Sequence, residues 1–262
     1  VCSSDLLAAY GSGAAQAALD MDRRVLNIDI GGATTKFALV DNGRVIAAAA
    51  MEIGGRHVAF DLENRIVRLD RAGAAYAQRV GVNWSLGAVA AKDDMGKVAQ
   101  AMAGDLIAAL TKRPAPEAVL ALFVTEPIAD FGALDGVMFS GGVAEYIYHR
   151  ETRDFGDLGW RLGRALRRLW DEGAAPWPLL EAGECIRATA LGALATHITG
   201  GFLDGPKASF QPMNINYGLL PPMEAPRHDG EGRKLQPQDR GRAKKRMMSE
   251  RAMADLETWL TG

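Results

Sequence analysis

The segment DIGGATT combines a carboxylate, a bare backbone and two hydroxyls within a few residues. Asp29 ends a short apolar run, Gly31 and Gly32 follow, and Thr34 and Thr35 come next. Because glycine lacks a Cβ, a turn there can bring main-chain N–H groups against a ligand, and successive N–H groups form an anion-binding concavity. The threonine hydroxyls add donors. These residue types at this spacing predict a phosphate-binding loop.

The carboxylate of Asp29 cannot face a phosphate without a cation between them. We therefore expect Asp29 to hold Mg²⁺ through water or to orient an attacking water. The segment is neither a Walker A loop nor a G-x-G-x-x-G turn. Taken alone, it also fits a plain β-hairpin whose glycines only permit the turn, so the motif by itself leaves both readings open.

A second junction of this kind is FSGGVAE, where a strand meets a glycine pair and then a helix. Bare backbone at Gly141 and Gly142 lets a base or ribose lie close, and Ser140 and Glu145 can bond to hydroxyls. A packing role for the glycines explains the pair equally well. A further glycine pair, Gly54-Gly55, predicts a turn that is followed by an acid at Asp61, and the order of the three junctions is more specific than any one of them.

The elements that must position these residues can be predicted from periodicity and turn residues. Asp41-Asn42-Gly43 predicts a hairpin between two strands, and Glu63-Asn64 predicts a second one. Three or four antiparallel strands in succession are expected from residue 24. Helices are predicted at 6–22, 93–112, 157–173 and 183–200, a buried strand at 23–30, and a strand, turn and helix across 136–148.

Composition excludes several classes of protein. The chain has 262 residues, 48% of them hydrophobic, and a formal net charge of −2, so no general nucleic-acid binder is indicated. No apolar run reaches the roughly 20 residues of a membrane span, and no signal peptide is evident. Cys2 and Cys185 are too few for a disulfide framework, which favours a reducing compartment. The four histidines show no metal-ligand spacing.

The ordered set of motifs resembles one branch of the actin, sugar-kinase and heat-shock-chaperone ATPases. VLNIDIGGATTKFALVDNGRV, IGGRHVAFD, SGGVAEYIYHRETRDFGDLG and PWPLLEAGECIRATALGALATH closely resemble the reactivating factors of ethanolamine ammonia-lyase, the ethanolamine utilisation protein A family. The resemblance spans roughly residues 7–197. It implies an α/β fold of the actin-like (ribonuclease H-like) type, with a mixed sheet of antiparallel hairpins plus parallel strands flanked by helices.

The resemblance also implies an activity. Such factors are chaperone-like ATPases with a weak, Mg-dependent activity that release damaged cobalamin from the lyase, with ATP and Mg²⁺ as cofactors and the lyase as partner. It implies a cytoplasmic location, with association to a bacterial microcompartment. The phosphate and Mg²⁺ loop would comprise Asp29, Gly31, Gly32, Thr34 and Thr35. The adenosine turn would comprise Ser140, Gly141 and Gly142, with Glu145 as its neighbour, and Gly54 and Gly55 would support the same lobe. A small-molecule kinase and an actin-like scaffold ATPase are the alternatives; the oligomeric state is not predicted.

The chain departs from that family in three respects. Ala33 stands where the family usually has a third glycine. The family's other phosphate loop precedes Val1, so we expect an N-terminally truncated fragment. Third, residues 199–262 do not resemble the family. The predicted organisation is a non-native leader at 1–6, an ATPase lobe at 7–198 and an irregular tail, disordered or non-native, at 199–262. The basic cluster 240–246 in that tail is interpreted as a solvated run.

Overall fold

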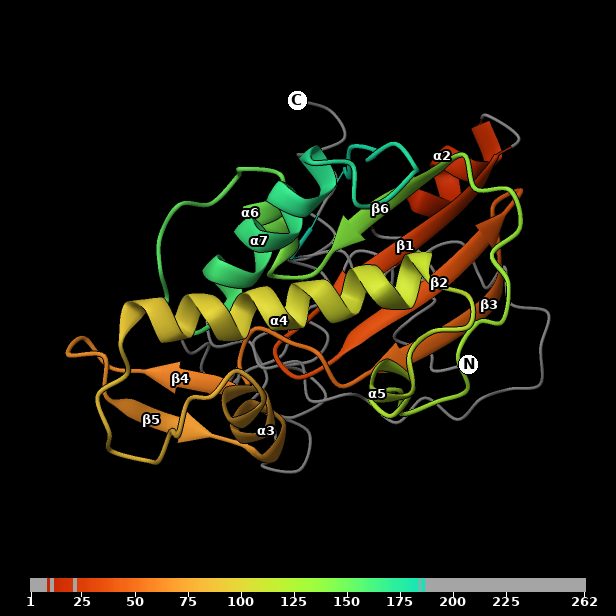
Figure 1. Cartoon of the computed structure of the whole chain (residues 1–262). Coiled ribbons are helices and arrows are strands. Elements are labelled where there is room, and N and C mark those ends of the chain that lie inside the picture. Colours follow the sequence, from red (N-terminus) through yellow and green to blue (C-terminus); the bar gives the residue numbers. More distant parts are fainter. Residues whose placement is uncertain (1–8, 10–11, 21–22, 184, 187–262) are drawn as a thin grey trace, which may run out of the picture. The chain divides into compact units, whose positions relative to one another are not determined.

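A four-stranded mixed sheet forms the centre of the described structure (Figure 1). The computed structural model describes residues 9, 12–20, 23–183 and 185–186. The strands are β1 (Arg24–Ile30), β2 (Thr35–Asp41), β3 (Arg44–Met51) and β6 (Gly136–Ser140), in the order β3-β2-β1-β6. The first three form an antiparallel meander, and β6 runs parallel to β1. The mixed α/β class predicted from the sequence is confirmed.

The meander follows from its local sequence. Every residue of β1 after Arg24 is buried, as its near-continuous apolar run requires for a strand between two neighbours. The β2–β3 turn has positive φ at Asn42 (46°) and Gly43 (74°), the conformation that tight hairpins prefer. The hairpin predicted at this position is confirmed.

The next two strands form a separate sheet. β4 (Val58–Phe60) pairs with β5 (Ile66–Leu69) around a turn in which Asn64 has φ of 60°, so this second hairpin is also confirmed. The expectation of three or four antiparallel strands in succession is confirmed for three strands, and the succession ends at β3. The reason is the stretch around Gly54-Gly55, which leaves the edge of β3 and packs on the β1–β2 loop.

Helices cover the sheet on both faces. α4 (Lys92–Thr111) and α7 (Gly159–Asp171) pack against each other, and both match helices predicted from the sequence. α3 (Arg71–Arg79), which the sequence did not single out, is tied to α4 through Tyr76 and Arg79, each bonded to Asp105. The shorter helices are α2 (Ala14–Asp20), α5 (Glu117–Leu120) and α6 (Ala144–Ile147).

Cross-strand pairing shows which side chains share a face of the sheet. Ile28 is paired with Phe37, and Asp29 with Lys36, so Asp29 lies on the face opposite Phe37.

No helix in the described part of the chain is both long and apolar enough to cross a membrane. The tail at 199–262 and most of the helix predicted at 183–200 lie outside the described residues.

Candidate functional site

The Asp29 carboxylate lies where two parallel strands end side by side. β1 and β6 are in register such that Asp29 is paired with Ser140, and Gly141 follows at once. Gly141 has φ of 85°, and a Cβ there would collide with the Asp29 carboxylate and the Ile30 carbonyl. Only glycine therefore fits at this contact, and the bends at 29–35 and 140–142 touch each other.

The β1–β2 loop presents unused main-chain donors. The Gly31 N–H donates to the Thr34 carbonyl at 3.0 Å, which closes the bend. Within the described residues, the N–H groups of Gly32, Ala33 and Thr34 donate to no protein oxygen. Gly32 and Ala33 are exposed. Three successive free amides at an exposed bend form the kind of concavity that binds anions.

The Gly54-Gly55 turn supports this loop from behind. The Gly55 N–H donates to the Gly31 carbonyl at 2.9 Å, and the Arg56 N–H donates to the Gly32 carbonyl at 2.6 Å. A Cβ on Gly54 would lie 2.5 Å from the Ala33 nitrogen. The two backbones are therefore in direct contact, which fixes the shape of the loop without any side chain between them.

The same turn also touches the start of α7. The Leu158 N–H donates to the Gly55 carbonyl at 2.9 Å, and a Cβ on Gly55 would lie 2.9 Å from the Gly159 Cα and 3.2 Å from Val143 Cγ2. The three glycine junctions singled out in the sequence thus meet at one place, together with the N-terminus of α7.

Two of the predicted donors have partners inside the protein. The Thr35 side chain is fully buried, and its hydroxyl donates to the Ile53 carbonyl at 2.8 Å. Ser140 is fully buried as well, and its hydroxyl accepts a hydrogen bond from the Asn27 amide at 3.1 Å. The structure therefore corrects the expectation that these hydroxyls face a ligand: both hold the loop and the strand ends in place.

The predicted adenosine turn is held by a distant segment. The Gly141 N–H donates to the Cys185 carbonyl at 3.0 Å, and the half-buried Glu145 accepts from the Ile186 N–H at 3.1 Å. Gly142 is partly open, and among the described residues a Cβ there would meet only Ile186, at 3.8 Å. Gly142 and Glu145 thus remain at the rim, while Gly141 is the buried hinge of the turn.

One charged pair beside the loop was missed by the sequence analysis. Arg56 Nε lies 3.1 Å from Asp157 Oδ2, with side chains 63% and 13% exposed. Asp157 Oδ1 also accepts the Gly159 N–H at 2.8 Å, at the start of α7. Burial raises the pKa of Asp157, and the bonds from Gly159 and Arg56 oppose that shift. Only the position of Arg56, directly after Gly54-Gly55, could have indicated it.

His57, the next residue, is part of the scaffold. Its side chain is buried, and its Nδ1 lies 2.9 Å from Asp70, whose carboxylate also caps α3 through the Gly73 N–H. Among the described residues, no cluster of three or more histidine, cysteine or acidic side chains could hold a metal ion. Any Mg²⁺ at Asp29 would therefore complete its shell with water and phosphate, as this cation usually does.

A model of one protein family matches residues 4–212 and is described as "Ethanolamine utilisation protein EutA". The chain belongs to this family. The family resemblance inferred from the motifs is confirmed at this level.

Curated relatives match over smaller parts of the chain. The methylenetetrahydrofolate–tRNA-(uracil-5-)-methyltransferase TrmFO of Phenylobacterium zucineum is 45% identical over 138 residues, or 49% of this chain and 28% of the relative. TrmFO of Caulobacter vibrioides is 64% identical over 75 residues, or 28% of this chain and 16% of the relative. The chain spans less than a third of these relatives.

Solved structures show weak similarity. Component A of (R)-2-hydroxyglutaryl-CoA dehydratase from Acidaminococcus fermentans has a TM-score of 0.35 and 17% identity, covering 71% of this chain and 65% of that one. MreB 5 of Spiroplasma citri bound to AMPPNP has a TM-score of 0.39 and 16% identity, covering 75% and 58%.

Proposed function

We propose that this chain carries the nucleotide-binding surface of an ATP-dependent reactivating factor whose target is ethanolamine ammonia-lyase. One observation carries the proposal: the Asp29 carboxylate lies against Gly141, beside three free main-chain amides. Ligands of α/β sheets bind outside the carboxyl ends of the strands, and β1 and β6 both end here. Membership of the EutA family supports the target.

The residues present fit a nucleotide with Mg²⁺. The amides of Gly32, Ala33 and Thr34 would bind phosphate oxygens, each bond to a charged group contributing about 1.5–3 kcal/mol. Asp29 would hold Mg²⁺ through water or orient the attacking water, and Mg²⁺ supplies neutralisation of phosphate charge when it is bound. The adenosine end would lie on the open backbone at Gly142, with Glu145 at the rim.

Thr35 and Ser140 have a supporting part in this proposal. The Thr35 bond to Ile53 ties the end of the loop to the segment that leads into Gly54-Gly55. The Ser140 bond to Asn27 ties β6 to β1 directly below Asp29. Loss of either hydroxyl would move the amides and the carboxylate relative to each other, although neither hydroxyl touches the nucleotide.

The contacts behind the loop offer a route from nucleotide to partner. A change at Gly31 and Gly32 acts on Gly55 and Arg56 through two backbone hydrogen bonds, and Gly55 bonds to Leu158 at the start of α7. ATP and ADP would shift α7 only by their different affinities for its two positions. We propose that this shift changes the affinity of the protein for the lyase, so that damaged cobalamin leaves and intact adenosylcobalamin enters.

The test is reactivation of ethanolamine ammonia-lyase blocked with cyanocobalamin. Lyase activity should return only when the protein, ATP, Mg²⁺ and adenosylcobalamin are all present. Asp29→Asn should bind nucleotide yet reduce ATP hydrolysis by about 10²–10⁴-fold, the usual contribution of a group that activates the nucleophile. Asp171→Asn, an exposed change on α7, is the control and should leave hydrolysis unchanged.

Two results would contradict the proposal. One is no recovery of lyase activity with folded, nucleotide-binding protein. The other is ATP hydrolysis unaffected by Asp29→Asn. ADP release stimulated by a sugar or carboxylate would favour the small-molecule kinase, and sedimentation on addition of ATP would favour the scaffold ATPase.

A further inference from the structure

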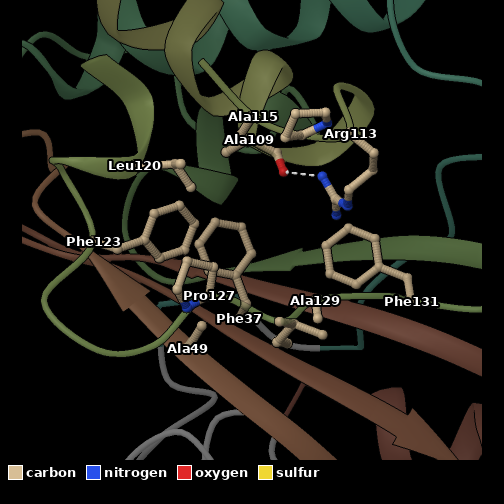
Figure 2. A pocket seen from close by; sticks show the side chains of 12 residues that line it. Phe37, Ala49, Ala109, Arg113, Ala115, Leu120, Phe123, Pro127, Ala129 and Phe131 are labelled. Atoms are coloured by element: carbon tan, nitrogen blue, oxygen red, sulfur yellow. Dashed lines mark hydrogen bonds between the residues drawn. The ribbon is translucent and has the colours of Figure 1, made fainter. Parts of the chain in front are cut away.

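An apolar pocket lies on the sheet face opposite Asp29. Figure 2 shows it between the side chains of Phe37 on β2, Ala49 on β3 and Ala109 near the end of α4, with Phe123 and Phe131 as further walls. Its volume is about 170 Å³. The candidate nucleotide site uses none of these residues, so the pocket is separate from that site.

Small residues leave the hollow, and aromatic rings define its shape. Ala49 is paired with Phe37 across β2 and β3, where a longer side chain would fill the space. The rings of Phe37 and Phe123 are stacked with centroids 5.9 Å apart and an interplanar angle of 26°. Flat walls of this kind suit a flat ligand, since aromatic pairs prefer offset stacking or edge contact.

The cationic side chain of Arg113 lines the pocket. The Arg113 guanidinium lies 4.6 Å above the centre of the Phe131 ring, and its Nη1 donates to the Ala109 carbonyl at 2.9 Å (Figure 2). Nη1 also donates to the Lys112 carbonyl at 2.8 Å. In the described part of the chain, Arg113 forms no salt bridge. The carbonyl bonds and the ring fix its position, which leaves a positioned positive charge beside an apolar hollow.

Size and charge together define the ligand class. An apolar cavity of about 150 Å³ holds one benzene molecule, so this pocket has room for a single ring. Guanidinium groups bind carboxylates through charge-assisted hydrogen bonds. We propose that the pocket binds a small aromatic carboxylate, with its ring against Phe37 and Phe123 and its acid group on Arg113.

The test compares phenylacetate with its uncharged counterpart phenylacetamide on the unaltered protein, by calorimetry and ligand-observed NMR. Phenylacetate should bind saturably and about 10-fold more tightly, because the amide loses the charge-assisted bond. Equal affinities would overturn the role of Arg113, and the absence of saturable phenylacetate binding would overturn the site. This comparison needs no variant to fold.

Three variants locate the binding. Ala49→Leu should abolish phenylacetate binding by filling the pocket. Arg113→Met, which keeps the stem over Phe131, should weaken it about 10-fold. Lys112→Met removes the neighbouring cation, which does not line the pocket, and should leave binding unchanged. Binding that survives Ala49→Leu in a folded protein, or that falls equally in Lys112→Met and Arg113→Met, would place the ligand elsewhere and refute the proposal.

Discussion

Gly141 is the residue on which the candidate site most depends. Its positive φ and its contact with Asp29 each require the absence of a Cβ, and they coincide at the point where β6 ends. Gly54 does not have a positive φ, but it too has no room for a Cβ, because it contacts the backbone of the β1–β2 loop. Sequence reasoning could single out both glycines, but it could not tell which of them touches the carboxylate.

Gly141→Ala should therefore destabilise the fold by roughly 2–5 kcal/mol, the sum of left-handed strain and overpacking. Gly81→Ala is the matched control, since Gly81 also has positive φ (77°) but no atom of the described residues lies within 4 Å of the added methyl. It should cost only about 1–2 kcal/mol. Urea denaturation measures both, and equal costs would show that the contact with Asp29 and Ile30 adds nothing.

Among the elements, α7 connects the loop support to the rest of the lobe. The Gly159 N–H in its first turn donates to the Asp157 carboxylate. The same carboxylate accepts a hydrogen bond from Arg56, which lies 101 positions earlier in the chain. The predicted bounds of this helix, 157–173, were close to the observed Gly159–Asp171 because its leucines recur at helical spacing. The ion pair was beyond sequence reasoning, because nothing local to either residue indicates the other.

Asp157 gives this part of the molecule a pH dependence. Burial raises its pKa above the ordinary value of 3.8, so its contribution to folding is fully present below that value and is lost as the pH rises through the raised pKa. Asp157→Asn removes this loss. The free energy of unfolding of the variant relative to the unaltered protein should therefore increase as the pH rises from 3.8.

Urea titrations across that pH range measure the difference. Glu172→Gln, an exposed change just beyond α7, controls for net charge. A difference between Asp157→Asn and the unaltered protein that falls as the pH rises would mean that the Arg56 bond outweighs burial.

At the scale of the whole molecule, local patterns predicted more than long-range ones. The Asn42-Gly43 turn and helix α4 depend on neighbouring residues, and both were predicted. The placement of β6 beside β1 depends on residues more than a hundred positions apart, and it was not predicted, because the family resemblance implied only that the sheet contains parallel strands. The apolar pocket was not predicted at all, because alanines at 49 and 109 have no signature until the sheet and α4 come together.

Nucleotide binding should stabilise the whole lobe, because the proposed site joins β1, β6 and α7. At a concentration 100 times Kd, ATP with Mg²⁺ should add about 2.7 kcal/mol to the free energy of unfolding. Inorganic triphosphate with Mg²⁺ at the same concentration as ATP should add less, because it lacks the adenosine end and so binds more weakly. Thermal unfolding with each ligand measures this, and equal shifts would remove the turn at Gly142 from the site.

The buried bonds from Ser12 to Asn27 (2.9 Å) and from Asn27 to Ser140 (3.1 Å) have a consequence for folding fidelity. If β6 docked on β1 one residue out of step, Ser140 would turn to the other face and the Asn27 amide would be left without an acceptor. Such an orphaned amide costs about 1–3 kcal/mol, so the misaligned sheet is penalised as it forms. The Asn27–Ser140 bond therefore favours the correct register of β6 beside Asp29, where a shift of one residue would disrupt the candidate site.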